Sequence, residues 1–172
     1  GFEVWKKTSP WKRSYIIRKI ADLMRKKNKE LANWMTLETG KPLAEALAEV
    51  SGSADIFEWN AEETKRIYGQ TVQSRFENTR VIINYEPVGV VAALSPWNFP
   101  LVLASRKIST ALAAGCSVIC KPDVITPGVV MELVDIINQC GVPPGVVNLL
   151  SGDPAKISSQ LISSDIIKKV SI

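Results

Sequence analysis

The 172-residue sequence contains no histidine. This absence excludes a Ser-His-Asp triad, a histidine general base and a histidine-containing zinc site within these residues. No apolar run is long enough to cross a membrane and no signal peptide opens the sequence, so we expect a cytoplasmic protein without a membrane partner. No GxGxxG follows a predicted strand, so the usual dinucleotide fingerprint is missing.

Cysteine is scarce as well. Cys116, Cys120 and Cys140 lie inside apolar or helical patterns, which favours buried, reduced thiols, and we predict no metal site. With 46% hydrophobic and 22% charged residues, the composition is typical of a globular protein rather than a disordered one. The length suffices for one sizeable domain, or one and a fraction.

The net charge of +4 is modest and concentrated in one early segment. A basic run of this kind can bind nucleic acid or an acidic membrane. The same run carries an apolar stripe at helical spacing, which favours the solvated face of an amphipathic helix. We therefore expect no nucleic-acid partner, and a basic nucleic-acid-binding helix stays open as an alternative. The basic residues are Lys12, Arg13, Arg18, Lys19, Arg25, Lys26, Lys27 and Lys29, and the stripe is Ile16, Ile20, Leu23 and Met24.

Three helices are predicted in the first part of the chain. The first begins at Ser9-Pro10, a capping hydroxyl followed by proline at the first helical position, and runs to about Lys27. The second ends at Gly40 and the third begins near Pro42. In the third, an unbroken apolar stripe predicts a face that packs in the core. The stripe consists of Leu43, Leu47, Val50, Ala54, Phe57 and Ala61.

From Thr71 the pattern changes from helical to extended. TVQSRF and RVIINYE flank Glu77-Asn78-Thr79, which predicts a β-hairpin. Four apolar runs, VGVVAAL, SVIC, VVNLL and KKVSI, then alternate with helical segments. This alternation predicts right-handed βαβ units and a parallel, doubly wound, Rossmann-like sheet. The expected fold is α/β, with N-terminal helices over 1–70, a hairpin over 71–86 and an incomplete sheet domain over 87–172.

Two strand ends should meet at one edge of this sheet, where open α/β sheets bind ligands. The first strand ends in SPWNFP and delivers Asn98, and the second delivers Lys121. Lys121 either reaches solvent or, with backbone donors of a helix capped by Thr126, holds an adenosine ribose or phosphate. Asn98 either bonds its own turn or donates to an oxygen that becomes negative during a reaction.

The segment EPVGVVAALSPWNFPLVLASRKISTALAAGCSVICKP closely resembles the aldehyde dehydrogenase superfamily. LETGKPLAEALAEV, FEWNAEETKRIYG and CGVPPGVVNLLSG extend the resemblance in collinear order over nearly the whole chain. The combination of EWNAEETKRIYG with SRKISTALAAG looks most like the succinate-semialdehyde dehydrogenase branch. The resemblance implies NAD(P)-dependent oxidation of an aldehyde, with succinate semialdehyde as the expected substrate.

The resemblance also implies roles for single residues. Asn98 matches the asparagine that helps form the family's oxyanion hole. Arg106, in SRK, matches the arginine that holds the distal carboxylate of the substrate. From the residues alone Arg106 could be a helix-surface cation, although adjacent Lys107, about 100° away around the helix, fits that description better. The cofactor, NAD or NADP, is expected to contact Leu94, Ser95, Pro96, Trp97, Lys121, Asp123 and Val124.

The cofactor preference is left open by one departure from the family pattern. Family members often read KPxE, with the glutamate on the ribose hydroxyls, whereas this chain reads KPDV and places Val124 there. The loss of that carboxylate removes repulsion toward a 2′-phosphate, which makes NADP tolerable. Asp123, one residue earlier, could compensate in part, so both NAD and NADP remain possible.

The family's nucleophilic cysteine and general-base glutamate belong to segments that this sequence does not contain. Cys116 falls at an ordinary structural position of the family pattern. We therefore expect a fragment that is inactive by itself. The alternative is a stand-alone nucleotide-binding or scaffold module without catalysis.

The predicted hairpin resembles the family's oligomerisation strands. Val81, Ile83 and Tyr85 alternate as they would in a half-buried strand. The resemblance therefore implies a homodimer or homotetramer for the full enzyme.

Overall fold

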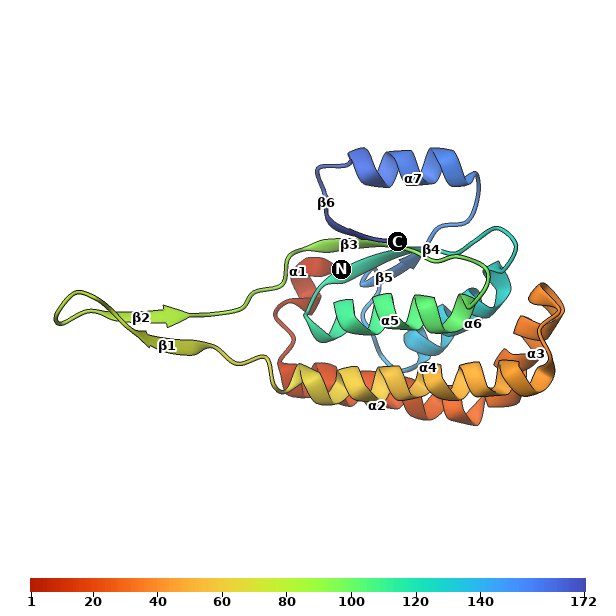
Figure 1. Cartoon of the computed structure of the whole chain (residues 1–172), viewed down its shortest axis with the longest axis horizontal. Helices are drawn as coiled ribbons and strands as arrows, with labels where there is room; N and C mark the ends of the chain where they lie inside the picture. The colour runs from red at the N-terminus through yellow and green to blue at the C-terminus, as the bar shows by residue number, and fades with distance from the viewer.

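The computed structural model describes all 172 residues, which form an α/β fold around a four-stranded parallel sheet. Figure 1 shows several helices on one face of the sheet, a single helix on the other, and a two-stranded arm that extends from the body. The predicted fold class is confirmed.

Four helices precede the sheet: α1 (Phe2–Trp5), α2 (Pro10–Lys26), α3 (Asn28–Thr39) and α4 (Leu43–Thr64). The start of α2 is the predicted one, because Ser9 Oγ accepts a hydrogen bond from Lys12 N at 3.3 Å. Gly40 ends α3 with a φ of 72°, in the left-handed region that glycine enters without strain. No helix in the structure is both long enough and apolar enough to cross a membrane.

The central sheet has the strand order β5-β4-β3-β6, and all neighbours are parallel. The strands are β3 (Val90–Leu94), β4 (Ser117–Lys121), β5 (Val147–Leu149) and β6 (Ile167–Ser171), and the helices between them are α5 (Pro100–Ala113), α6 (Pro127–Gln139) and α7 (Pro154–Ser163). Figure 1 shows α5 and α6 on one face and α7 on the other. The chain therefore reverses its winding beside β3, as the prediction of a doubly wound sheet requires.

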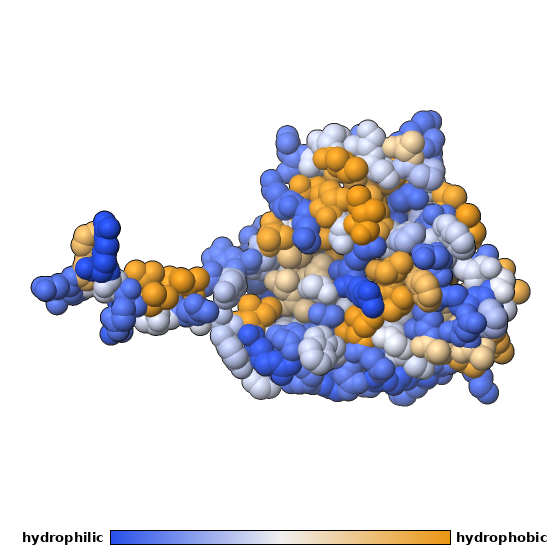
Figure 2. Space-filling view, viewed as in Figure 1, coloured by the Kyte–Doolittle hydropathy of each residue, from blue (hydrophilic) through white to orange (hydrophobic).

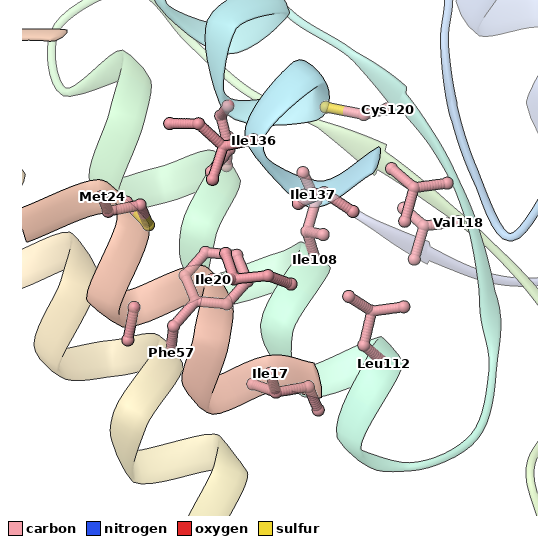
Figure 3. Close-up of a cluster of buried hydrophobic side chains, with 14 of the residues drawn as sticks. Ile17, Ile20, Met24, Phe57, Ile108, Leu112, Val118, Cys120, Ile136 and Ile137 are labelled. Carbon is pink, nitrogen blue, oxygen red and sulfur yellow. The ribbon is translucent and has the colours of Figure 1, made fainter. Parts of the chain in front are cut away.

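The hydrophobic core lies between the sheet and the N-terminal helices (Figure 3). Ile17, Ile20 and Met24 of α2 lie with Phe57 of α4 among side chains from α5, α6 and β4. The helices of residues 1–64 therefore share one core with the sheet. The stripe predicted for α4 is confirmed for its central members, since Val50, Ala54, Phe57 and Ala61 are fully buried, whereas Leu43, in the first turn, is exposed.

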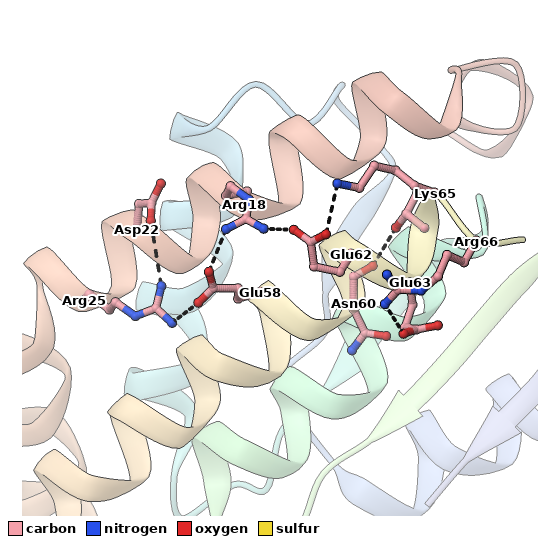
Figure 4. A network of polar contacts seen from close by, with 10 residues as sticks. Arg18, Asp22, Arg25, Glu58, Asn60, Glu62, Glu63, Lys65 and Arg66 are labelled. Atoms are coloured by element: carbon pink, nitrogen blue, oxygen red, sulfur yellow. Dashed lines mark hydrogen bonds and ion pairs between the residues drawn. The ribbon is translucent and has the colours of Figure 1, made fainter.

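The basic segment of α2 forms ion pairs with α4 (Figure 4). Arg18 Nη1 lies 2.6 Å from Glu58 Oε1, and its Nη2 pairs with Glu62. Arg25 Nη2 lies 2.7 Å from Asp55 Oδ1. These side chains are more than a third exposed, so the pairs contribute little net stability. The apolar side of the same helix is buried, which confirms the amphipathic interpretation of this segment.

The arm is an antiparallel hairpin of β1 (Gln70–Gln73) and β2 (Arg80–Ile83), with Val72 opposite Val81. The hairpin is as predicted. Every residue of both strands is exposed, and Tyr85 beyond them is exposed too. The reason is that no element of the chain covers either face of the arm, which carries hydrophobic surface in Figure 2.

Candidate functional site

The candidate site lies at the carboxyl end of β3, where the sheet changes its direction of winding. The chain leaves β3 through α5 on one face and returns to β6, on the other side of β3, through α7 on the opposite face. Open α/β sheets bind their ligands at such a switch point. SPWNFP, residues 95–100, is the turn that follows β3 at this point.

The turn is anchored to the sheet at its start and exposed in its middle. Ser95 N donates to Lys121 O at 3.1 Å, which continues the pairing of β3 with β4. Pro96, Trp97 and Asn98 are exposed. The Asn98 backbone carbonyl accepts a hydrogen bond from Lys41, but its side-chain amide has no hydrogen-bond partner in the chain. The interpretation of Asn98 as a turn residue that bonds its own backbone is therefore wrong.

Lys121 lies on β4 opposite Leu94, so the two predicted strand ends do meet at one edge. It is only 6% exposed, which contradicts the alternative of a strand-end lysine that reaches solvent. Its Nζ donates to Pro122 O at 2.9 Å and has no carboxylate partner. A buried ammonium has three donors, so two of them remain available to a ligand.

The helix after Lys121 is not capped in the predicted way. Thr126 is its N-cap residue, but the hydroxyl is buried and makes no hydrogen bond. Glu38 of α3 takes the cap instead, accepting hydrogen bonds from Gly128 N at 2.5 Å and Val129 N at 3.1 Å. A carboxylate is the stronger acceptor for backbone N–H groups at a helix start, which explains why it displaces the local hydroxyl.

Carboxylates also cap the other two helices that follow a strand, from a distant segment at α5 and from the N-cap residue itself at α7. Glu49 of α4 accepts hydrogen bonds from Leu101 N and Val102 N at the start of α5. Asp153 accepts hydrogen bonds from two backbone N–H groups of α7. All three helix starts thus bind carboxylates of the protein itself. The expected phosphate site at the start of α6 is therefore occupied by Glu38.

The remaining residues of the predicted cofactor site fit the sugar part of a nucleotide better than its phosphates. Asp123 Oδ1 accepts a hydrogen bond from Ile125 N at 3.0 Å, which leaves its second oxygen free, and Val124 is exposed beside it. The buried hydroxyls of Ser95 and Thr126 have no partner in the chain. These two hydroxyls are shielded from solvent, so Lys121 and the free oxygen of Asp123 are the groups of this set that can pair with hydroxyls of a sugar.

Of the two adjacent cations of α5, Lys107 is not the helix-surface cation that the sequence predicts. Lys107 points inward and donates to Leu94 O at 2.7 Å, and burial lowers its pKa. Arg106 is exposed and forms no ion pair. It lines a surface hollow together with Leu103, Val88 and Lys107, and this hollow includes no residue of SPWNFP. The structure thus does not bring Arg106 and Asn98 into one pocket.

None of the three thiols is placed for chemistry. All are free and buried, as predicted. Burial raises the pKa of Cys120 to about 12 and also raises the pKa of Cys140. A thiol that stays protonated at neutral pH and is shielded from solvent is a poor nucleophile.

Sequence reasoning missed Lys41 and Glu49, which hold the turn and the start of α5, and Glu38, which caps α6. The sequence does contain a signal for one of these residues, Glu49. Glu49 directly precedes Val50 in the apolar stripe of α4, a place where an unpaired carboxylate is costly. Its partners come from distant segments, so no local pattern could name them.

A sequence model described as the aldehyde dehydrogenase family matches residues 1–172. The 4-(hydroxymethyl)benzenesulfonate dehydrogenase of Comamonas testosteroni is 44% identical over 99% of this chain and 36% of its own length. The NADP-dependent succinate-semialdehyde dehydrogenase of Escherichia coli is 41% identical over 97% of this chain and 35% of its own. Among solved structures, succinate-semialdehyde dehydrogenase from Burkholderia pseudomallei superposes with a TM-score of 0.97 at 38% identity, over 98% of this chain and 35% of that one.

The chain thus spans about a third of the length of the curated relatives it matches. Within that span the agreement covers the helices, the hairpin and the sheet alike, because the match extends over nearly every residue described above. The chain belongs to the aldehyde dehydrogenase family.

Proposed function

We propose that this protein oxidises an aldehyde to the carboxylic acid with NAD or NADP, and that succinate semialdehyde is its substrate. The observation that carries the proposal is the Asn98 amide, which is exposed at the switch point of the sheet and has no hydrogen bond within the chain. A neutral donor in such a place can stabilise an oxyanion that forms during acyl chemistry.

Asn98 acts when a nucleophile adds to the carbonyl carbon and the aldehyde oxygen becomes negative. Its Nδ2–H donates to this oxygen, whereas an aspartate at the same position would repel it. None of the three cysteines serves as the nucleophile, because all are buried. We infer that the nucleophile lies outside these 172 residues.

When bound, NAD or NADP would supply the oxidant, by taking a hydride from the aldehyde carbon, and water would supply the second oxygen of the acid with release of a proton. Lys121 would hold the hydroxyls of the adenosine ribose, with Asp123 beside it. Leu94, Ser95, Pro96 and Trp97 would line the path of the cofactor at the end of β3. Val124 places no charge next to the 2′ position, so NADP as well as NAD is accommodated.

The substitution Asn98→Ala in the intact native protein tests this role. We expect kcat to fall about 100- to 1000-fold, because one oxyanion donor is lost. The Asn98→Asp variant should lose at least as much, since the new carboxylate repels the developing charge. An Asn98→Ala enzyme with the kcat of the native protein would contradict the proposed role of Asn98.

Substrate choice rests on Arg106. The relatives above are named for substrates that carry a sulfonate or a carboxylate away from the oxidised carbon. The exposed guanidinium of Arg106 has no ion-pair partner in the chain, so its planar fork is free to bind such a group in bidentate fashion. We infer that it holds the distal carboxylate of succinate semialdehyde. The hollow that Arg106 lines does not include Asn98, so this role requires the substrate to reach from the SPWNFP turn to that hollow, and it is supported by the resemblance of SRK to the family and by the unpaired guanidinium.

The matching test compares a charged with an uncharged substrate. In Arg106→Ala, the KM for succinate semialdehyde should rise while the KM for an uncharged aldehyde of similar length stays unchanged. A lost charge-assisted pair should lower the specificity ratio about ten- to a hundred-fold. Arg106→Lys keeps the charge without the fork and should fall in between. Equal losses on both substrates would mean that Arg106 does not bind the carboxylate. The proposed substrate would then be an aldehyde of unspecified class.

A second candidate is a nucleotide-binding or scaffold module without catalysis, favoured by the absence of an accessible thiol in residues 1–172. The mass of the native protein separates the two candidates. A native chain of 172 residues that binds NAD(P) but reduces none in the presence of succinate semialdehyde would favour the module. A longer native chain with steady NAD(P)H production would favour the enzyme.

We also infer that the hairpin pairs with a second copy of the chain in a homodimer or homotetramer. Its exposed strands carry Val72, Val81 and Ile83 on one face, by the register of β1 and β2. An apolar edge of this kind is a ready template for another chain.

A further inference from the structure

The start of α5, which carries the SPWNFP turn, is held by residues from outside the helix. Its N-cap residue, Phe99, makes no side-chain cap. Glu49 Oε1, from the second turn of α4, accepts hydrogen bonds from Leu101 N and Val102 N, each at 3.1 Å. These two donors are among those that a local capping residue would satisfy. A carboxylate about fifty residues earlier in the chain therefore fixes where α5 begins.

The other oxygen of this carboxylate connects to the turn through a lysine. Lys41 Nζ pairs with Glu49 Oε2 and also donates to Asn98 O at 3.1 Å. The same ammonium lies 4.1 Å from the ring centroid of Phe99. One cation thus contacts the carboxylate, the backbone of Asn98 and the next side chain.

The ion pair between Lys41 and Glu49 is buried, so both charges lose most of their hydration. The side chains of Lys41 and Glu49 are only 10% and 3% exposed. A buried ion pair seldom improves stability over apolar residues of similar size, because both charges lose their hydration. Such a pair can instead supply a defined geometry. Each buried charge is stabilised only while all its hydrogen-bond partners stay in place, so the partners are held in one arrangement.

We propose that Lys41 and Glu49 are positioning residues that hold the backbone of Asn98 and thereby its side-chain donor. This inference rests on the proposed oxyanion role of Asn98 and names the residues that support it. Neither residue touches the substrate. A rigid donor is more effective than a mobile one, because a displacement of about 1 Å can cost about a hundred-fold in rate.

The start of α6 provides a matched control. Glu38 accepts hydrogen bonds from Gly128 N and Val129 N there, just as Glu49 does at α5. No lysine joins Glu38 to the preceding turn, and Asn98 is not part of that turn. The Glu38→Gln substitution therefore weakens a comparable cap without touching the Asn98 turn.

The first test is a double-mutant cycle in the intact native protein. Glu49→Gln and Lys41→Met should each lower kcat about ten- to a hundred-fold, with little change in the KM for the aldehyde. In the Asn98→Ala background, the same substitutions should lower kcat less than about two-fold further, because the group they position is gone. Glu38→Gln should change kcat by the same factor in both backgrounds.

The combined Lys41→Met and Glu49→Gln variant is the control for misfolding of the single variants. It removes both charges and so leaves no unpaired ion in the interior. This variant should melt close to the native protein and still have the low kcat. A full, additive loss in the Asn98→Ala background would overturn the positioning role alone. Native kcat in Asn98→Ala would overturn the oxyanion role, and the positioning role with it.

The second test does not depend on activity. In the native protein, NMR relaxation should show an ordered backbone at Asn98 that becomes mobile in Lys41→Met, because the ammonium holds the Asn98 carbonyl. Amide exchange at Leu101 and Val102 should become about ten-fold faster in that variant, while Gly128 and Val129 stay protected. A backbone at Asn98 that is as ordered in Lys41→Met as in the native protein would overturn the proposal.

Discussion

The sheet and the hairpin are built from similar residues but lie in opposite environments. In β3, Val91, Ala92 and Ala93 are consecutive and buried, so both faces of the strand are covered. In the hairpin, Val72 and Val81 face each other across the register and are each 41% exposed. Valine thus favours an extended backbone in both places, while burial is decided by whatever lies above and below the strand.

This contrast indicates different sources of stability. An isolated two-stranded hairpin is marginally stable in water, because it buries little apolar surface. The sheet is covered by α5 and α6 and, behind them, by α2 and α4. The core should therefore determine whether the chain folds, and the hairpin should determine what the folded chain associates with.

The largest effect is expected from a substitution in the core. Phe57 is fully buried between α4 and the layer of α2 and α5, and Phe57→Ala should lower the free energy of unfolding by about 3–5 kcal/mol. The matched control is Phe76→Ala, since Phe76 lies at the exposed end of the arm, and its effect should stay within about 0.5 kcal/mol. Urea unfolding of both variants measures the difference, and equal losses would remove the distinction between core and arm.

An intermediate effect is expected from the buried thiol on β4. Burial raises the pKa of Cys120 from 9.0 to about 12. Above pH 9 the unfolded chain releases the thiol proton while the folded chain retains it, so stability falls as the pH rises. The loss should approach about 1.4 kcal/mol per pH unit until the folded thiol also ionises near pH 12.

Unfolding curves of the native chain and of Cys120→Ala between pH 8 and pH 11 isolate this contribution from the other groups that titrate. The native chain should lose stability with a steeper slope than the variant. Parallel pH profiles would mean that water reaches Cys120 in the folded state.

The smallest effect on stability is expected in the hairpin. Combining Val72→Thr with Val81→Thr should change the free energy of unfolding by less than about 0.5 kcal/mol, because both side chains are largely exposed. Sedimentation should nevertheless show weaker self-association than for the native chain. Unchanged self-association would show that the arm does not take part in the proposed assembly. A large loss of stability would mean that the arm packs against the rest of the chain.

Much of the fold could be predicted because its signals are local. Ser9-Pro10 starts a helix, Gly40 ends one, and apolar spacing separates helices from strands over a few residues. The meeting of Asn98 and Lys121 at one edge also follows, since adjacent parallel strands bring their carboxyl ends together. Thr126 is the N-cap residue of α6 as predicted, but a carboxylate that lies far away in the sequence, and not the Thr126 hydroxyl, accepts the hydrogen bonds of the helix start.

The sequence by itself determined the helices and strands, the direction in which the sheet winds, and the place of the SPWNFP turn, because each follows from periodicity and backbone chemistry within a short window. Only the tertiary structure decided that Lys107 turns inward while Arg106 faces solvent, and that Glu49 and Glu38 cap α5 and α6. These choices depend on hydrogen bonds between segments that are distant along the chain. A buried charge takes the partner that the fold brings to it, and no local pattern specifies that partner.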